Sequence, residues 1–386
     1  MTDSALTTEP LDRLRDLVLA DAALQRALAP LDAEALSQRL LAFAAERAIA
    51  VEAAHLAPFL RPDPVGISAL TDPVPLRRLW PSPDWLPVAV RRFPTGEAAV
   101  DWAHFGGAHL TSPFFAADAR PIEARPFNRL FRYRMRLDDF VAASAGEKLP
   151  EPDGFIFHMS RCGSTLVTQM LAALPGSEIV SEPAPLDAAA RRAFARGTPD
   201  PVAILRAMIG AFGRRGGRPF VVKTGFWQAL ALPLYRRAFP SVPWLFLFRE
   251  PVEILVSQLR ERGPETMPLV SPIPGIDPAA PDADQIAQAL AAVCEAAADT
   301  AVSEGGLFVD HADLPEAVFT AILPHFGMDA EDARAAMAAA ARRDAKNPSA
   351  AFEPDGAAKR AQADARLRAA AGRLGPVYER LYALRR

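Results

Sequence analysis

Short strand-like segments alternate with helical patterns through the second half of the chain. The strand-like segments cover residues 155–157, 178–183, 219–225, 242–251 and 306–310. Most are followed by apolar residues three or four positions apart, which is typical of one face of a helix. The fourth segment is apolar at nearly every position, and such strands are buried on both faces of a parallel sheet. The pattern therefore predicts an α/β fold in which helices flank a parallel β-sheet.

The first 62 residues have the pattern of a small helical bundle. Apolar residues recur at helical spacing from Leu11 onwards, and Asp21 and Asp32 are placed to cap the helices that follow them. We expect three short helices between Asp12 and Leu60, forming an accessory domain of residues 1–62.

Residues 63–150 predict a linker and a small α+β intermediate region. The segment from Arg61 to Pro87 is rich in Pro and reads as an extended linker, and Trp80 and Trp85 indicate that it docks on its neighbours. A basic cluster follows, either as a solvated strand face or as a wall for an anionic ligand. Its members are Arg129, Arg132, Arg134 and Arg136.

Composition and charge narrow the class of protein. Of the 386 residues, 50% are hydrophobic and 23% are charged, as in an ordinary soluble globular protein. The net charge of −3 gives no indication of a nucleic-acid partner. No apolar run approaches the roughly 18 residues of a membrane span, so we expect no membrane partner. The two cysteines, Cys162 and Cys294, form no disulfide framework or metal spacing, which favours a cytoplasmic setting.

The main candidate chemistry lies between the first strand of the sheet domain, expected at residues 151–386, and its helix. A turn that connects a strand to a helix directs backbone N–H groups and the helix N-terminus at an anion. In this turn Gly163 lets the backbone approach a ligand, Ser164 and Thr165 add hydroxyl groups, and Arg161 adds a guanidinium fork. The other interpretation is a strand–turn–helix unit that packs without a ligand.

The loop differs from the nucleoside-triphosphate pattern G-x-x-x-x-G-K-[ST], because His158 replaces the first Gly and no Lys follows Gly163. It resembles instead the 5′-phosphosulfate loop of the sulfotransferases that use 3′-phosphoadenosine 5′-phosphosulfate (PAPS). The resemblance implies a P-loop-type fold and a donor site that includes Ser160, Arg161, Cys162, Gly163, Ser164 and Thr165. Ser160 and Cys162 depart from the family pattern, although small residues still fit.

A second motif supports the same resemblance. Arg249-Glu250-Pro251, with Ser257 downstream, is similar to the 3′-phosphate motif of this family and implies that Arg249 and Ser257 hold that phosphate. Otherwise Arg249 caps a helix or pairs with Glu250. The family's C-terminal loop R-K-G-x-x-G-x-W is absent. Its substitutes would be Lys346, Asn347 and Lys359, unless residues 342–362 form an ordinary solvated basic loop.

The resemblance also implies in-line sulfuryl transfer, for which a metal is not obligatory. Arg161 and Lys223 would stabilise the developing charge, and Glu182, at a strand end, would be the general base. His158 is the competing base. The structural alternatives are that Glu182 caps a helix and that Lys223 is an ion-pair partner.

The N-terminal helices resemble the Nif11-like leader domain through residues 16–24 and 44–48, with Ala48 where that family usually has Gly. This resemblance implies a peptide-related role; a packing or oligomerisation bundle is the alternative.

Three functions remain open at this point: a PAPS-dependent sulfotransferase, a P-loop kinase of a small molecule, and a non-catalytic protein that binds a nucleotide or peptide. The acceptor of a sulfotransferase could be a peptide, a sugar, a lipid or a small phenol. The number of subunits is not specified by any pattern.

Overall fold

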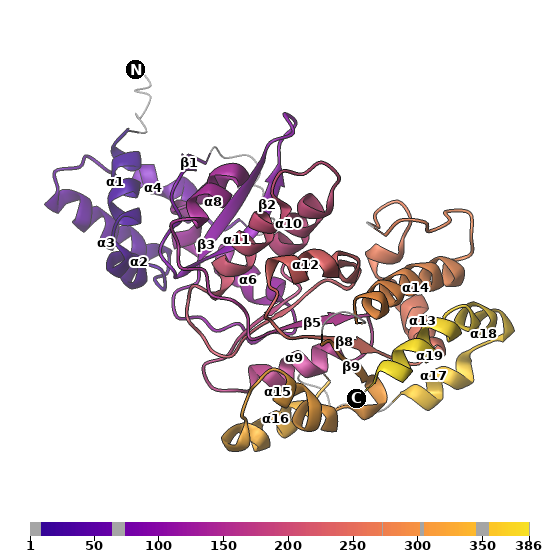
Figure 1. Cartoon of the computed structure of the whole chain (residues 1–386). Helices are drawn as coiled ribbons and strands as arrows, with labels where there is room; N and C mark the ends of the chain where they lie inside the picture. The colour runs from indigo at the N-terminus through magenta and orange to yellow at the C-terminus, as the bar shows by residue number, and fades with distance from the viewer. Residues whose placement is uncertain (1–8, 64–73, 272, 302–304, 345–354, 386) are drawn as a thin grey trace. The chain divides into compact units, whose positions relative to one another are not determined.

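The computed structural model describes residues 9–63, 74–271, 273–301, 305–344 and 355–385. Its contacts divide the chain into two units (Figure 1). Unit 1 consists of Met1–His109 and Ala116–Lys148, and unit 2 consists of Leu110–Phe115 and Leu149–Arg386. The predicted domain boundaries at residues 62 and 150 stay predictions.

Unit 1 begins with four helices: α1 (Glu9–Leu19), α2 (Ala22–Leu28), α3 (Ala33–Glu46) and α4 (Ala53–Leu60). The expected count of three was wrong. Both predicted caps are present, because the Asp21 carboxylate accepts from the Ala23 and Leu24 N–H groups and that of Asp32 accepts from Ala35. A reciprocal capping box between Glu52 and His55 starts the fourth helix.

The turn after α3 contains Ala48, the residue that stands where the resembled family usually has Gly. Its φ angle is 54°, in the left-handed region that favours Gly. The resemblance to Nif11-like leaders stays a prediction.

The remainder of unit 1 contains a four-stranded sheet in the order β1-β4-β3-β2. Its strands are β1 (Leu76–Arg77), β2 (Trp85–Arg92), β3 (Ala98–His104) and β4 (Tyr133–Arg136), and its helices include α6 (Phe115–Glu123), α7 (Pro126–Leu130) and α8 (Leu137–Ser144). Trp80 and Trp85 are buried, and Trp85 Nε1 donates to Gln25 Oε1 at 2.9 Å. The Pro-rich segment therefore docks, as expected, as far as its described residues show.

The basic cluster of unit 1 has a structural role at two of its positions. Arg134 is buried, and its Nη2 atom donates to Asp101 Oδ2 at 2.9 Å. Arg136 forms an exposed ion pair with Glu97. The interpretation as a solvated face is therefore wrong for Arg134, whose charge is compensated inside the sheet.

Unit 2 is built on a five-stranded sheet in the order β6-β7-β5-β8-β9, and every neighbouring pair is parallel. Its strands are β5 (Gly154–His158), β6 (Glu178–Ser181), β7 (Phe220–Lys223), β8 (Trp244–Phe248) and β9 (Leu307–Asp310). All strand residues are buried. The predicted α/β class with a parallel sheet is confirmed.

Helices cover both faces of this sheet. In Figure 1, α9 (Ser164–Ala172) lies on one side of the strands, and α10 (Ala184–Phe194), α11 (Pro201–Gly213) and α12 (Leu232–Ala238) lie on the other. The long α14 (Asp282–Ala301) packs against the 3₁₀ helix η1 (Phe226–Ala231) and the terminal helix α19 (Gly375–Leu384). The other segments are α13 (Pro251–Arg260), η2 (Pro264–Thr266), η3 (His311–Asp313), the π-helix η4 (Val318–Ile322), α15 (Leu323–His325), η5 (Glu331–Ala333), α16 (Arg334–Ala341), α17 (Gly356–Gln362) and α18 (Ala365–Gly372).

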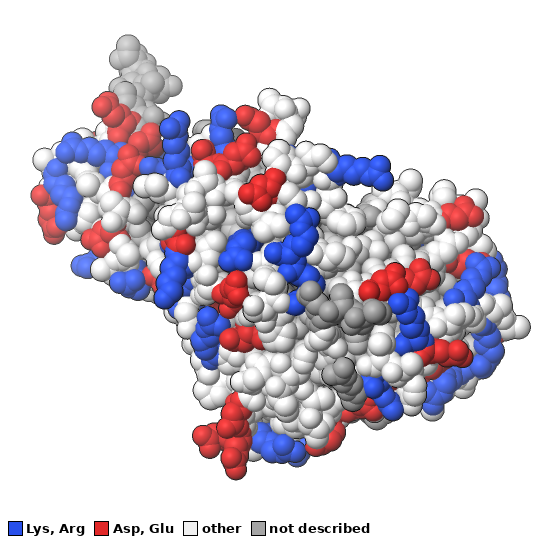
Figure 2. Space-filling view, in the orientation of Figure 1, with Lys and Arg blue, Asp and Glu red and all other residues white. Residues whose placement is uncertain are grey.

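One expectation about the C-terminal part was wrong. Residues 342–362 were expected to form an irregular loop, but α17 occupies 356–362 and packs against α13. Lys346 and Asn347 lie outside the described residues. Among the helices that the structure describes, none is long and apolar enough to cross a bilayer. On the face drawn in Figure 2, basic and acidic residues are interspersed.

Candidate active site

The carboxyl ends of the five parallel strands surround a cavity of about 420 Å³, which is within the size range of small-molecule sites. The loop after β5 lines this cavity. One residue from the segment that follows each of the other four strands also lines it. These residues are Glu182 after β6, Phe226 after β7, Arg249 after β8 and His311 after β9. Strand ends that are far apart in sequence therefore meet here, as expected for an open parallel sheet.

The loop after β5 has an unusual backbone. Ser160 and Arg161 have φ angles of 60° and 50°, and such left-handed conformations cost a non-Gly residue roughly 1–2 kcal/mol. Gly163 has a φ of 85°, and a Cβ atom there would lie 2.9 Å from His311 Cδ2. The sharp turn ends at α9, whose N-cap Gly163 supplies no side chain to the first N–H groups. The helix therefore presents its positive end to the cavity without a side-chain cap.

Behind this loop the buried Lys223 connects Glu182 with Thr165, and all three residues were predicted for the site. Lys223 is 0% exposed, and its Nζ atom lies 2.6 Å from Glu182 Oε1 and 3.1 Å from Thr165 Oγ1. A cation thus lies beside the loop although the loop contains no Lys. The structure brings Glu182, Lys223 and Thr165 into one cluster.

Glu182 lies at the edge of the cavity and is not a helix cap. Helix α10 begins at Ala184, and its N-cap residue is Pro183. Glu182 has a φ of 49°, another left-handed conformation, and its side chain is 29% exposed. Backbone strain of this kind occurs at functional sites more often than elsewhere.

His158, the competing base, has both ring nitrogens engaged. Nδ1 accepts from the Ser160 N–H group at 3.1 Å, so Nε2 carries the proton and lies 3.0 Å from the Thr224 carbonyl oxygen. Nε2 is also 3.5 Å from Glu182 Oε1. His158 therefore connects the loop after β5 to the residue that follows β7.

Arg249 is 7% exposed and forms ion pairs with two carboxylates. Its Nη2 atom is 2.6 Å from Glu253 and 3.3 Å from Asp355. The alternative pairing with Glu250 is wrong, because the Glu250 carboxylate caps α13 by accepting from the Val252 and Glu253 N–H groups. Ser257, one turn after Glu253 on α13, lines the same cavity.

Lys359, on α17, lines the same cavity as Arg249. It is 5% exposed, and its Nζ atom is 2.8 Å from Asp355 Oδ2, so the expectation of a solvated basic loop was wrong at this position. Burial opposes ionisation of Asp355, but Lys359 and Arg249 outweigh it and hold the pKa of that carboxyl below its ordinary value. Burial lowers the pKa of Lys359, and Asp355 partly offsets this.

Two members of the predicted loop set have constrained side chains. The Arg161 guanidinium is paired with Glu261, at 2.6 Å from Oε2 and 2.7 Å from the carbonyl oxygen. Both contacts are made by Nη2, and Arg161 also lines the cavity. Cys162 is fully buried, and burial raises the pKa of its thiol to about 12. The thiol is therefore neutral.

Sequence reasoning missed His311 and Glu265, both of which line the cavity. Burial, reinforced by Arg249, lowers the pKa of His311 to about 4, so its imidazole is neutral at pH 7. Its position directly after β9 matches that of Arg249 after β8 and could have indicated it. Burial and the carboxylates of Glu182 and Asp187 raise the pKa of Glu265. No local pattern marked Glu265, which lies in a short 3₁₀ helix.

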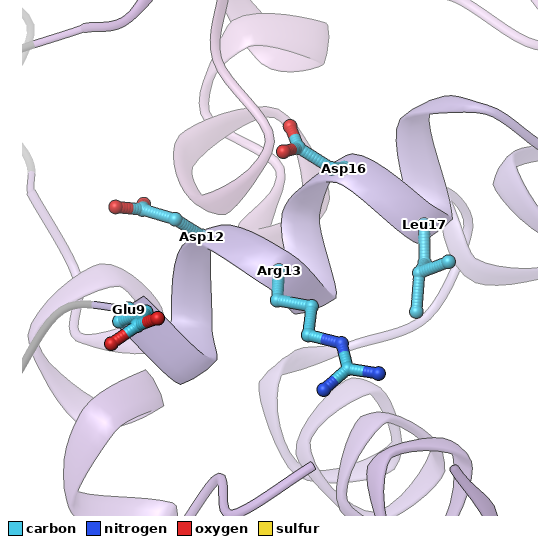
Figure 3. A pocket seen from close by; sticks show the side chains of 5 residues that line it. All are labelled: Glu9, Asp12, Arg13, Asp16 and Leu17. Atoms are coloured by element: carbon cyan, nitrogen blue, oxygen red, sulfur yellow. The ribbon is translucent and has the colours of Figure 1, made fainter.

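A second hollow lies along α1 in unit 1 (Figure 3). Glu9, Asp12, Arg13 and Asp16 project from successive turns and point away from one another. Asp12 is paired with Arg15. These side chains do not converge on a common point, so we assign no ligand to this hollow. Within the described ranges, no group of three or more His, Cys, Asp or Glu residues is arranged to hold a metal ion.

Comparison with known proteins gives one solved structure to report. No family model matches the chain, and no curated protein matches it. The sulfotransferase domain from the Synechococcus PCC 7002 olefin synthase is 18% identical, with a TM-score of 0.40. The match covers 60% of this chain and 96% of that domain. An identity this low transfers no activity, so the function has to be argued from the site.

Proposed function

We propose that this chain is a sulfotransferase that moves a sulfuryl group from PAPS to a hydroxyl or amine of a small-molecule or peptide acceptor. The observation that carries the proposal is that two separate groups of hydrogen-bond donors and cations line one cavity, and we assign each of them to an anion. One is the loop after β5 with the N-terminus of α9, and the other is Arg249 with Ser257 and Lys359. A donor with a phosphosulfate at one end and a 3′-phosphate at the other matches this arrangement.

The first anion site fits a 5′-phosphosulfate. The N-terminus of α9 has no side-chain cap, so its first N–H groups and its positive end are open to an anion. The hydroxyl groups of Ser164 and Thr165 lie on the same turn, and Lys223 supplies the nearby positive charge.

The second anion site fits a 3′-phosphate through an exchange of partners. Asp355 is bound to both Arg249 and Lys359, yet its side chain is 47% exposed. A dianionic phosphate would replace this single carboxylate and keep both cations paired. Glu253 is buried and also contacts Arg360, so it would stay and orient Arg249.

In the proposed reaction the acceptor oxygen bonds to sulfur while the bond between sulfur and the bridging phosphate oxygen breaks. The acceptor proton passes to the Glu182 carboxylate, and the leaving adenosine 3′,5′-bisphosphate retains the electron pair. Lys223 and the α9 N–H groups stabilise the charge that develops on the leaving phosphate. A sulfuryl group carries less negative charge than a phosphoryl group, so this step does not require a metal.

A P-loop kinase is the second candidate, because Lys223 beside Thr165 could take the part of the missing loop lysine. Thermal shift measurements with three nucleotides separate the two. Adenosine 3′,5′-bisphosphate should stabilise the protein clearly more than AMP, which differs only by the 3′-phosphate. Arg249→Ala should abolish that difference while the AMP shift persists, which also shows that the variant is folded.

Stabilisation only by ATP with Mg²⁺, and not by adenosine 3′,5′-bisphosphate, would favour the kinase instead. No shift with any of the nucleotides would favour a protein without a nucleotide site. A cytoplasmic location and a peptide-related role of the N-terminal helices stay predictions.

A further inference from the structure

We propose that the acceptor carries a protonated amine or a guanidinium group, because the end of the cavity that holds Glu182 is acidic and aromatic. This inference rests on the proposed function and deepens it by assigning the substrate class. It comes from four residues that line the cavity but do not belong to either anion site: Phe114, Glu182, Phe226 and Glu265.

These residues lie at one end of the cavity. The Phe114 ring centroid is 5.1 Å from Lys223 Nζ, which places the ring beside the Lys223–Glu182 pair. Phe226 is the third residue after Lys223, at the start of η1. Glu265 lines the same cavity as Glu182, and the negative charge of Glu182 adds to burial in raising the pKa of Glu265. The cations of the donor end, Arg249 and Lys359, are instead bound to Glu253 and Asp355.

Glu265 differs from its acidic neighbours in its partners. Glu182 is paired with Lys223, and Asp187 is paired with Arg191 at 2.7 Å. Among the described residues, no Lys, Arg or His forms an ion pair with Glu265. Elsewhere on the wall Arg343 and Asp344 are adjacent and opposite in charge, so together they add no net charge. Glu265 therefore adds a carboxylate that no described side chain pairs with, although the charge of Arg191 acts on it without an ion-pair contact.

A carboxylate that is largely removed from water is stabilised by a cation that binds to it. Aromatic faces attract the same cations through their ring quadrupoles. A cationic acceptor would therefore bind at this end, while an anionic acceptor would be repelled by Glu265. The negative donor and the positive acceptor are thus directed to opposite ends of one cavity.

The test compares three phenols that differ in charge: tyramine, 4-ethylphenol and 4-hydroxyphenylacetate. Calorimetry is carried out at pH 7.5 on full-length protein saturated with adenosine 3′,5′-bisphosphate. Tyramine should bind about tenfold more tightly than neutral 4-ethylphenol, and 4-hydroxyphenylacetate should bind most weakly. Equal or weaker binding of tyramine relative to 4-ethylphenol would overturn the inference.

The variant Glu265→Gln tests the residue itself, with Glu331→Gln as a control that removes an exposed carboxylate outside the cavity. Glu265→Gln should abolish the tenfold preference for tyramine, and Glu331→Gln should leave it unchanged. A preference that survives in Glu265→Gln refutes the role of Glu265. Bisphosphate binding is measured first in each protein. If the unmodified protein does not bind the bisphosphate, the result counts against the sulfotransferase. If it binds the bisphosphate but shows no preference for tyramine, the result counts only against the cationic acceptor.

Discussion

Replacing Glu182 by Gln separates catalysis from donor binding. The amide keeps the shape of the side chain but cannot accept the acceptor proton, so the rate of sulfuryl transfer should fall by about 10²- to 10⁴-fold. Donor binding should persist, because neither anion site uses Glu182. Single-turnover conversion of labelled PAPS measures the first effect, and the thermal shift with adenosine 3′,5′-bisphosphate measures the second. Full turnover in Glu182→Gln would remove this residue as the base.

The same substitution has a cost in stability that follows from Lys223. Lys223 is 0% exposed, and its Nζ atom would lose the carboxylate at 2.6 Å, which leaves a buried charge with Thr165 as its remaining described hydrogen-bond partner. Breaking a buried ion pair costs about 3 kcal/mol, which corresponds to a fall in Tm of roughly 6–12 °C.

A double-mutant cycle checks this reasoning. Lys223→Met alone removes the lysine cation from Glu182, whereas Glu182→Gln with Lys223→Met removes both charges. The double variant should be more stable than the sum of the two single effects predicts, by about 1–3 kcal/mol. Strictly additive losses in denaturant unfolding would show that the pair is not coupled, and the assignment of Lys223 as its partner would fail.

Three further predictions follow from single contacts. Gly163→Ala should weaken bisphosphate binding at least tenfold in titration calorimetry and lower the Tm, because a Cβ would lie 2.9 Å from His311 at a left-handed φ; unchanged binding would contradict the loop assignment. The pKa of His311 is about 4 in the folded state against 6.5 ordinarily, so the unfolded state takes up its proton first. Unfolding free energy should therefore fall as the pH drops from 6.5 to 4, by up to about 3 kcal/mol, and His311→Gln should reduce this dependence in denaturant titrations. Asp355→Asn should tighten bisphosphate binding several-fold, because the competing carboxylate on Arg249 and Lys359 is removed; weaker binding in calorimetry would refute the exchange of partners.

Much of the fold could be predicted because its signals are local. Near-continuous apolar character identified β8 as a buried strand, and Asp21 and Asp32 cap the helices that their positions predicted. The helix count in unit 1 was one too low: the predicted caps Asp21 and Asp32 begin α2 and α3, whereas α4 is only eight residues long and has its N-cap at Glu52, where no cap was predicted. Short helices depend on packing for their stability and leave a weak periodic signal.

The residues of the candidate site likewise fall into those that a sequence rule could indicate and those that it could not. Arg249 was proposed from the resemblance of its motif, whereas the rule that functional residues gather at the carboxyl ends of parallel strands was enough to propose Glu182. The same rule would also have selected His311. It could not select Glu265 or Lys359, which lie on a 3₁₀ turn and a short helix away from any strand end.

The sequence by itself determined the parallel sheet and the tight turn between β5 and α9, because periodicity and turn chemistry act between residues that are close along the chain. Only the tertiary structure decided the partners of the charged groups. Arg249 contacts Asp355, which is 106 positions away, and it contacts Glu253 where Glu250 was an equally good choice by sequence. The physical reason is that a buried charge takes whichever opposite charge the packed strands and helices bring within reach, and that depends on strand order and helix packing.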